Sequence, residues 1–334
     1  MNAKIRSLAT YVPERRVSSS EVEDLLRAEN PSVRIQPGII ESVTGIRERR
    51  YAAEGEYNSH LAARAAERAL ADANLTVADI DLLIFASAGQ DLIEPATAHI
   101  VQSMLGTNCR VFDIKNACNS FINALQVAEA MIASGKHMRV LIATGEVPSV
   151  AVKWQVADRD DFKRSFAGYT LGDAGAAAVL ERADDISGII ASAGTADSTR
   201  WDAGTLPGGG SRHPRGDEWS YFAGDGAALK AAFESIGPGF VHEFLKENGI
   251  AASDLARIFI HQVSIPYLES FITALDFDSA KVARTVDRYG NTAAATLPLG
   301  IRESLDEGVL NDGDLILLVG LAGGISLEAM LIRW

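Results

Sequence analysis

An internal repeat constrains the fold of this 334-residue chain more than any other feature of its sequence. The segment 74–86 reads NLTVADIDLLIFA and the segment 249–261 reads GIAASDLARIFIH, which aligns Asp79 with Asp254 at an offset of 175 residues (254 minus 79). The run VLIATG at 140–145 has its counterpart, LILLVG, at 315–320, and the offset is the same. Two separate segments that share one offset indicate that a structural unit has been duplicated.

Each copy of the repeat has the pattern of an α/β unit. Its apolar runs are continuous rather than alternating, which is typical of strands that are covered on both faces of a sheet, and helical segments flank them. The sequence therefore predicts an α/β fold of two related halves, residues 1–185 and 186–334, which share one core.

Cys118 lies where a strand-like run meets an amphipathic helix. After it, apolar residues recur at helical spacing at Phe121, Leu125, Ala128 and Ile132, and Gly135 offers a stop. A cysteine at a helix N-terminus lies near the positive end of the helix dipole, which favours the nucleophilic thiolate. The alternative interpretation is a small buried apolar residue without chemistry.

The repeat gives Cys118 a counterpart in the second half. The offset maps it onto Ala293, two residues after Asn291, in another turn that opens onto a helix. If a pseudo-twofold axis relates the halves, both helix starts face one site, and Asn291 supplies an amide donor opposite the thiol. The alternative role for Asn291 is that of a turn or helix-cap residue.

His261 ends the apolar run 258–260, at the carboxyl end of an expected buried strand. Ligand sites of parallel sheets lie at this end of the strands. A single histidine after a strand is usually structural. A cysteine, a histidine and an asparagine at the ends of elements in a duplicated fold instead predict one active site.

These residues lie in motifs that resemble the ketoacyl synthase III-type condensing enzymes of the thiolase superfamily, over essentially the whole chain. The motifs are TGIRERR (44–50), NACNSF (116–121), GDAGAAAVLE (172–181), HQVS (261–264), YGNTAAATLPL (289–299) and GLAGGIS (320–326). The resemblance implies a thiolase-like fold, in which the two halves form αβαβα layers.

The resemblance also implies a role for each site residue. Cys118 accepts the acyl group, and the backbone N–H groups of Cys118 and Gly323 form the oxyanion hole. His261 and Asn291 donate hydrogen bonds to the carbonyl of the second thioester. Each such donor lowers the activation free energy by roughly 2.7–4 kcal/mol. The implied reaction is a ping-pong Claisen condensation of acyl thioesters in fatty-acid, polyketide or related secondary metabolism.

Departures from related families narrow this interpretation. The loop 321–324 lacks the second cysteine of the thiolases, and 86–89 lacks the glutamate of the hydroxymethylglutaryl-CoA synthases. Ile39 stands where the fatty-acid initiation enzymes have a tryptophan that stacks on the adenine of coenzyme A. This difference favours a carrier protein as the acyl donor.

Glu94 stands where the initiation enzymes have an apolar residue that reaches the acyl pocket of the neighbouring subunit. A carboxylate there resembles the bacterial enzymes that join two acyl thioesters head to head without decarboxylation, in which it is the base in the partner's site. The alternative is a helix N-terminal acid beside Pro95. Both the decarboxylative and the non-decarboxylative reactions remain open at this point.

Two further functions compete with condensation. The first is an acyltransferase that passes the acyl group from Cys118 to an alcohol or an amine. The second is a non-catalytic partner subunit of a condensing heterodimer. The presence of Cys118, His261 and Asn291 argues against a silent subunit.

Composition sets the expected partners and compartment. A net charge of −13 argues against nucleic acid, and no apolar run approaches the 18 residues of a membrane span. The N-terminus lacks the apolar region of a signal peptide. The chain has only two cysteines, which indicates a reduced compartment, and their spacing is poorly suited to binding a metal together. We therefore expect a cytoplasmic homodimer that needs no metal or cofactor and uses phosphopantetheine thioesters of coenzyme A or acyl carrier protein.

Basic residues form two groups in the sequence. They are Arg47, Arg49 and Arg50 in the first group, and Lys153, Arg159, Lys163 and Arg164 in the second. Either these groups are solvated faces, or they form a landing patch for phosphopantetheine, coenzyme A or an acidic carrier protein. The substrate-binding residues expected from this pattern are Arg47, Arg159, Lys163 and Arg164.

Overall fold

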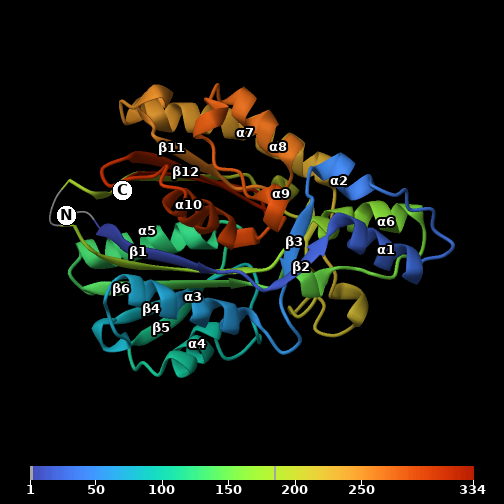
Figure 1. Cartoon of the computed structure of the whole chain (residues 1–334), viewed down its shortest axis with the longest axis horizontal. Helices are drawn as coiled ribbons and strands as arrows, with labels where there is room; N and C mark the ends of the chain where they lie inside the picture. Colours follow the sequence, from blue (N-terminus) through green and yellow to red (C-terminus); the bar gives the residue numbers. More distant parts are fainter. Residues whose placement is uncertain (1–2, 184–185) are drawn as a thin grey trace.

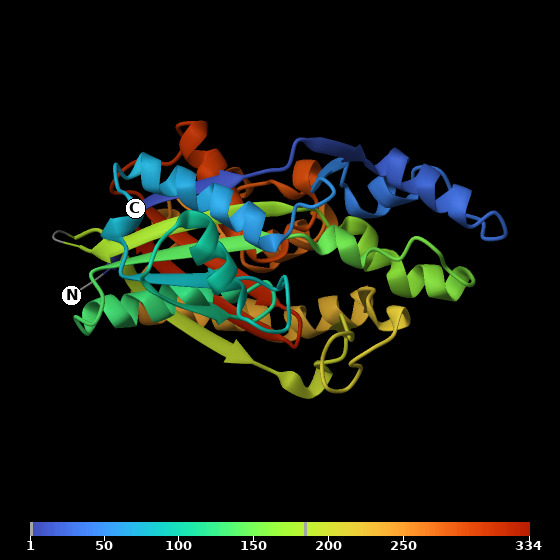
Figure 2. The same ribbon diagram turned by 90° about the horizontal axis from the view of Figure 1, so that it is seen from below.

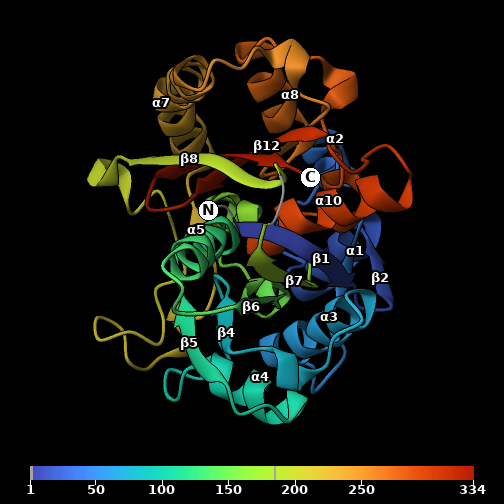
Figure 3. The same ribbon diagram turned by 90° about the vertical axis from the view of Figure 1, so that its left-hand side faces the viewer.

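The computed structural model describes residues 3–183 and 186–334, and these form five layers (Figure 1). Helices α7 (Gly226–Glu247) and α8 (Ile265–Ala274) cover a four-stranded sheet, and α3 (Asn58–Asp72) and α4 (Thr97–Leu105) cover a five-stranded sheet. Helices α5 (Ser120–Ala133) and α10 (Thr296–Asp306) lie between the two sheets, as Figure 3 also shows. The predicted αβαβα arrangement is confirmed.

The two sheets repeat one topology. In spatial order, the first contains β1 (Ala3–Tyr11), β7 (Ala174–Arg182), β6 (Arg139–Glu146), β4 (Leu82–Ala86) and β5 (Arg110–Ile114). The second contains β8 (Gly188–Ala196), β13 (Ser326–Arg333), β12 (Leu315–Ala322) and β11 (Arg257–Ile260). In both, the first two pairings are antiparallel and the third is parallel. The duplication inferred from the 175-residue offset is therefore confirmed.

The fifth strand differs between the halves. In the first sheet β5 pairs with β4 in parallel along its whole length. At the same place in the second sheet, Val282 makes a single parallel bridge to Ile258 of β11. Strand β5 is an edge strand, and its residues from Val111 to Ile114 are only partly buried. The first half thus keeps a sheet edge that the second half has almost lost.

The strands of the two sheets do not interleave in sequence. Those of the first sheet lie within residues 3–182, and those of the second within 188–333. We propose that the halves divide at 185/186 as the sequence indicates, between β7 and β8; residues 184 and 185 lie outside the described part of the chain.

Helix α5 is apolar on several faces because both sheets cover it. Phe121, Leu125 and Ala128 are fully buried, as their spacing predicts. They belong to a core that also contains Ile142 of β6 and Leu318 of β12. Truncation of a buried phenylalanine such as Phe121 to alanine typically costs about 3–5 kcal/mol, so this shared core holds the halves together.

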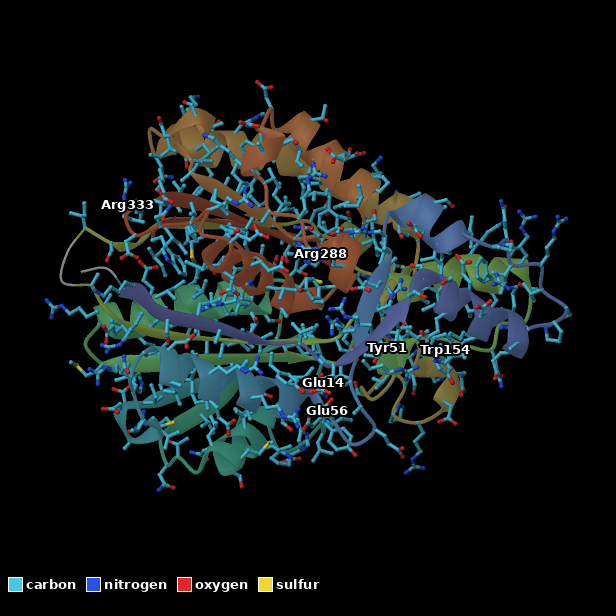
Figure 4. All side chains as sticks on the ribbon, in the orientation of Figure 1. Glu14, Tyr51, Glu56, Trp154, Arg288 and Arg333 are labelled. Carbon is cyan, nitrogen blue, oxygen red and sulfur yellow. The ribbon has the colours of Figure 1, made fainter. Side chains whose placement is uncertain are left out.

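A peripheral lobe projects from one end of the layers (Figure 2). It contains α1 (Ser19–Glu29), α2 (Ile39–Thr44), α6 (Arg159–Ser165) and the hairpin of β2 (Arg15–Ser18) with β3 (Glu48–Tyr51). Tyr51 and Trp154 lie in this lobe (Figure 4) and pack in a small apolar core of its own. The remaining elements include α9 (Val286–Tyr289), the ribbon of β9 (Gly204–Thr205) and β10 (Ala223–Gly224), and 3₁₀ helices such as η8 (Ala293–Ala295). Within the described ranges, no helix has both the length and the apolar character to cross a bilayer.

Arg49 is enclosed at the base of this lobe. Its side chain is fully buried and donates to the Ser19 hydroxyl and to the carbonyl of Tyr169, at 3.1 and 2.9 Å. A Cβ added at Gly290 would come within 3.3 Å of the Arg49 Cβ. The interpretation of Arg49 as part of a surface landing patch is therefore wrong, because local sequence does not reveal that this charge is enclosed.

Gly290 gives the first prediction, because it holds the segment that carries Asn291. Its φ is +67°, and an added Cβ would lie 2.4 Å from the Thr170 carbonyl oxygen. Gly290→Ala should lower the free energy of unfolding by roughly 2–5 kcal/mol, from left-handed strain and overpacking together. Chemical denaturation measures this change.

Gly239 is the matched control. It lies in α7, and an added Cβ would meet no atom within 4 Å. Gly239→Ala should leave stability unchanged or raise it by up to about 1 kcal/mol. Equal effects of the two substitutions would contradict the tight packing assigned to Gly290.

Candidate active site

Cys118 sits in a tight turn between β5 and α5. Ala117 has a φ of +46°, and the N–H groups of Asn119 and Ser120 bond to the carbonyls of Asn116 and Ala117. The Ser120 hydroxyl accepts the N–H of Asn116 at 2.9 Å and donates to the Ala117 carbonyl at 2.7 Å. This network fixes the backbone of the cysteine before the helix begins.

The cysteine turn is bound to the glycine loop of the other half, which is the GLAGGIS segment at 320–326. Asn119 is fully buried, and its Nδ2 donates to the carbonyl and hydroxyl oxygens of Ser326 at 3.1 and 3.0 Å. A Cβ added at Gly320 would lie 2.3 Å from the Asn119 Oδ1. Only glycine permits this approach, so position 320 lets the two halves meet beside the thiol.

His261 follows β11 directly, as predicted. Its backbone N–H continues the sheet by donating to the Val319 carbonyl at 2.9 Å, next to Gly320. The side chain is 3% exposed, and its Nδ1 has no hydrogen-bond partner in the described part of the chain. Burial lowers the pKa of His261 to about 4, so the imidazole is neutral at neutral pH.

Asn291 is oriented by its own backbone. Its Oδ1 accepts the N–H of Ala293 at 3.0 Å, which turns the Nδ2 donor away from the helix start. Its backbone N–H donates to Thr170, and its carbonyl accepts from Gly172. In the side chain of Asn291, the Oδ1 is therefore occupied by Ala293, and the Nδ2 is the group that can donate to a substrate.

Gln262 links the histidine to the asparagine segment. It is 2% exposed; its Oε1 accepts from the N–H groups of Thr285 and Val286, and its Nε2 donates to Ala283 at 2.7 Å. Gln262 was not predicted from the sequence as a site residue. Its position directly after His261 was the available signal, since a polar side chain at a strand end needs partners.

Glu146 is the second residue that sequence reasoning missed. It ends β6 and is 1% exposed, and its carboxylate accepts N–H groups from Ala88 at 2.7 Å, Gly89 at 3.2 Å and Ala294 at 3.3 Å. Burial raises the pKa of Glu146 to about 7. This carboxylate joins both halves, and its charge acts on Cys118. A glutamate that ends a continuous apolar strand was the available signal.

These contacts bring together the segments that carry Cys118, His261 and Asn291. His261 neighbours the strand that carries Gly320, which Asn119 touches. Glu146 contacts η8, just after Asn291, and interacts electrostatically with Cys118. The hydrogen bonds thus run from each half to the other across the cysteine turn.

The electrostatics of the thiol differ from the sequence expectation. Burial raises the pKa of Cys118 to about 12, and the charge of Glu146 adds to this effect. Helix α5 begins at Ser120 with Asn119 as its cap, so Cys118 lies outside the helix. Burial and the charge of Glu146 thus both favour the neutral thiol over the thiolate expected from the helix start.

The glycine loop carries the other proposed oxyanion donor. Gly323 lies in the turn between β12 and β13, where Gly324 and Ile325 both have positive φ. This turn leads directly to Ser326, the residue that binds Asn119. The loop with Gly323 therefore lies next to the turn with Cys118.

Glu94 is exposed to solvent. It belongs to an exposed loop before α4, beside Leu92 and Ile93, which are 52% and 71% exposed. Among the described residues, no hydrogen bond or ion pair joins Glu94 to the cysteine turn.

The residues predicted to bind phosphopantetheine, coenzyme A or a carrier protein lie in two places. Arg47 pairs with Asp287 at 2.6 Å. Arg159, Lys163 and Arg164 share the exposed face of α6. On that helix Asp160 and Asp161 pair with Lys163 and Arg164, so the surface carries mixed charge rather than a uniform positive patch.

Comparisons with known proteins agree with this architecture. Two family models match: 3-oxoacyl-[acyl-carrier-protein (ACP)] synthase III over residues 112–198, and its C-terminal part over 245–334. Beta-ketoacyl-[acyl-carrier-protein] synthase III of Bacillus pumilus is 31% identical, over 100% of this chain and 99% of the relative. The chain belongs to the 3-oxoacyl-ACP synthase III family. It is a cysteine-dependent acyltransferase that forms carbon–carbon bonds in fatty-acid or related biosynthesis.

Solved structures show the same similarity. The synthase III of Aquifex aeolicus is 30% identical with a TM-score of 0.86, over 99% of this chain and 100% of that one. A variant of OleA from Xanthomonas campestris is 26% identical with a TM-score of 0.91, over 100% and 99% of the chains. Other OleA structures carry a replaced cysteine, histidine or glutamate, and one holds lauric acid and lauroyl-CoA.

The charge of Glu146 gives the second prediction. At a pH above about 7 this carboxylate is ionised and disfavours the Cys118 thiolate. Glu146→Gln should therefore lower the pKa of Cys118 and speed its alkylation by iodoacetamide roughly 3- to 10-fold. Peptide mapping with time follows the reaction.

Cys109 is the internal control in the same samples. It lies away from Glu146, and its pKa is raised by burial and by the charge of Asp81. Its alkylation rate should not change in the variant. Slower alkylation of Cys118 in Glu146→Gln would show that the carboxylate activates the thiol instead.

Proposed function

We propose that this enzyme loads an acyl group onto Cys118 and condenses it with a second acyl thioester bound by His261 and Asn291. The observation that carries the proposal is the junction of the Cys118 turn with the Gly320–Ser326 loop, which brings residues of both halves to one thiol. The substrates are phosphopantetheine thioesters, carried by coenzyme A or by an acyl carrier protein. No step assigned to these residues calls for a metal or another cofactor.

Acylation begins from the neutral thiol. The Cys118 sulfur attacks the thioester carbonyl, the bond from that carbonyl to the donor sulfur breaks, and the thiol proton passes to the donor sulfur, which departs as a free thiol. The backbone N–H groups of Cys118 and Gly323 stabilise the oxyanion. Because the pKa of Cys118 is about 12, a stable thiolate does not precede the substrate, and proton loss is coupled to the attack.

Condensation uses His261 and Asn291 as neutral donors. The low pKa of His261, about 4, keeps the imidazole uncharged, so it can donate one N–H to the thioester carbonyl without bringing a positive charge into the pocket. Asn291 donates its amide beside it. Together they stabilise the enolate that attacks the acyl group on Cys118.

We infer a homodimer from the open edge of the first sheet. Strand β5 is at this edge, and a hollow of about 370 Å³ runs along it, lined by residues that include Val111, Phe112 and Met131. Pairing of this edge with a second copy would cover these partly buried apolar side chains. The exposed Leu92 and Ile93 then suit an interface rather than solvent.

In this dimer, Glu94 serves as the base in the partner's active site. Its loop carries two exposed apolar residues, Leu92 and Ile93, that can insert into a neighbour. A carboxylate base makes condensation independent of decarboxylation. The likeness to OleA, for which a glutamate variant has been solved, supports this assignment.

A carrier protein is the donor that fits the lobe surface. Arg159 and Arg47 are exposed, and Ile39, on α2, replaces the aromatic residue expected for adenine stacking. We assign Arg47, Arg159, Lys163 and Arg164 to carrier or phosphopantetheine contact. The two free cysteines and the thioester substrates favour the cytoplasm.

The third prediction tests the nucleophile. Cys118→Ser should lose the acyl adduct and all condensation, because a serine hydroxyl at this place has no base that activates it. Cys109→Ser is the control and should retain both. Intact-protein mass spectrometry after incubation with acyl-CoA measures the adduct. An adduct that persists in Cys118→Ser and maps to Cys109 would defeat the assignment.

The fourth prediction tests Glu94. Glu94→Gln keeps the shape of the side chain but removes the base, so condensation of two unactivated acyl thioesters should collapse while acylation of Cys118 survives. Product analysis with malonyl and non-malonyl substrates separates the two reactions. Full activity of the variant with a malonyl donor, and no activity of the native enzyme without one, would establish a decarboxylative synthase.

Mixed dimers test delivery across the interface. When Glu94→Gln and Cys118→Ala subunits combine, half of the sites retain both groups and half lack both. Activity should therefore reappear on mixing two inactive variants. Continued inactivity of the verified heterodimer would place Glu94 and Cys118 of one subunit in the same site.

A further inference from the structure

A polar hollow of about 540 Å³ adjoins the cysteine turn. Asn116, two residues before Cys118, lies at one side, and Gly323 of the oxyanion loop lies at another. The end of β8 and the start of β13 form the remaining walls, together with Gln126 of α5. Its volume is within the usual range of small-molecule sites.

Glu328 is the unusual residue in this wall. It is 9% exposed and lies on β13 directly opposite Gly194 of β8. A Cβ added at Gly194 would lie 2.5 and 2.7 Å from the two carboxylate oxygens of Glu328. The carboxylate thus occupies space that exists only because residue 194 is a glycine.

The charge of Glu328 is poorly compensated by the protein. Its Oε2 accepts one hydrogen bond, from the Gln126 amide at 2.9 Å. Within the described ranges, none of the ion pairs involves Glu328. A largely buried carboxylate with a single neutral donor retains the capacity to accept further hydrogen bonds from a ligand.

Side-chain amides connect this carboxylate to the cysteine turn. Asn116 donates to Asn123 at 2.8 Å, Asn123 donates to Gln126 at 2.9 Å, and Gln126 donates to Glu328. Each donor points in the same direction, toward the carboxylate at the end. Glu328 therefore fixes the orientation of a chain of amides that begins beside the nucleophile.

We propose that this hollow receives the far end of the acyl group on Cys118, and that Glu328 selects acyl groups bearing a hydroxyl or amino donor several atoms from the thioester. The hollow is lined by Asn116 of the cysteine turn and by Gly323 of the oxyanion loop, so it is the space next to the acyl group that Cys118 would carry. A plain alkyl chain would leave Glu328 buried without a new donor, and that is unfavourable. This inference rests on the proposed function, since it requires acylation of Cys118.

The test compares the loading of matched acyl groups. The native enzyme is offered octanoyl-, 8-hydroxyoctanoyl- and 8-aminooctanoyl-CoA, with their shorter and longer homologues, and mass spectrometry follows the acyl-enzyme. In each case a bond forms between the acyl carbon and Cys118 Sγ, the thioester bond breaks, and coenzyme A leaves as its thiol. We expect a donor-bearing series to load about 10- to 100-fold faster than the alkyl series, the effect of one hydrogen bond to a charged group.

Glu328→Gln separates selection from catalysis. It retains the size of the side chain and a hydrogen bond with Gln126 but removes the charge, so the alkyl series should load faster, and the advantage of the donor-bearing series should fall about 10-fold or more. If only the amino series loses its loading advantage, Glu328 selects a cationic group. If the hydroxyl and amino series both lose it, Glu328 selects any hydrogen-bond donor. Glu247→Gln, an exposed change of the same charge in α7, is the matched control and should alter neither series.

Gly194→Ala provides a second variant, because its Cβ displaces the carboxylate without removing it. It should reduce the same preference, with thermal melting as the check on folding. Faster loading of the alkyl series by the native enzyme, with no change in Glu328→Gln, would overturn the inference. If no acyl group of any kind loads onto Cys118, the proposed function itself fails, and this inference fails with it.

Discussion

The approach of Asn119 to Gly320 is the contact on which the active site depends. It joins the cysteine turn of one half to a strand of the other, at a distance that any side chain at position 320 would prevent. The bonds from Asn119 to Ser326 hold the oxyanion loop against the same turn. Helix α5, packed between two sheets, supplies the rigid base for both.

Desolvation is the dominant electrostatic force at this site. It raises the pKa of both Cys118 and Glu146 and lowers that of His261, so each group is pushed toward its neutral form. A neutral pocket suits a reaction between two uncharged thioesters, in which negative charge develops only in the transition state. Fixed N–H donors then stabilise the negative charge that develops on the thioester oxygens.

The sequence predicted the parts of the structure that depend on pattern. The repeat offset predicted two related α/β halves, and four strands of each sheet indeed follow the same order. Helical spacing predicted the residues of α5 that are buried. The position of His261 after an apolar run placed it correctly at the end of β11. These features are local or periodic, so they can be read from one chain.

Features that depend on tertiary enclosure could not be read in this way. Arg49 occurs among other basic residues in the sequence, but the fold encloses it completely. The raised pKa of Cys118 could not be predicted, because proximity to a helix is visible in the sequence, whereas burial and the charge of Glu146 are not. Glu146 and Gln262 act by binding backbone groups of distant segments, for which no local pattern exists.

The two left-handed alanines show how duplication has restricted this chain. Ala117 precedes the nucleophile and Ala293 follows the asparagine, with φ values of +46° and +48° at nearly equivalent places in the two halves. Only one of these turns carries a reacting atom, yet both retain the same uncommon backbone shape. The bend before the thiol and the bend after the amide are therefore set by the backbone of each half, and the side chain beside each bend decides what that half contributes to the reaction.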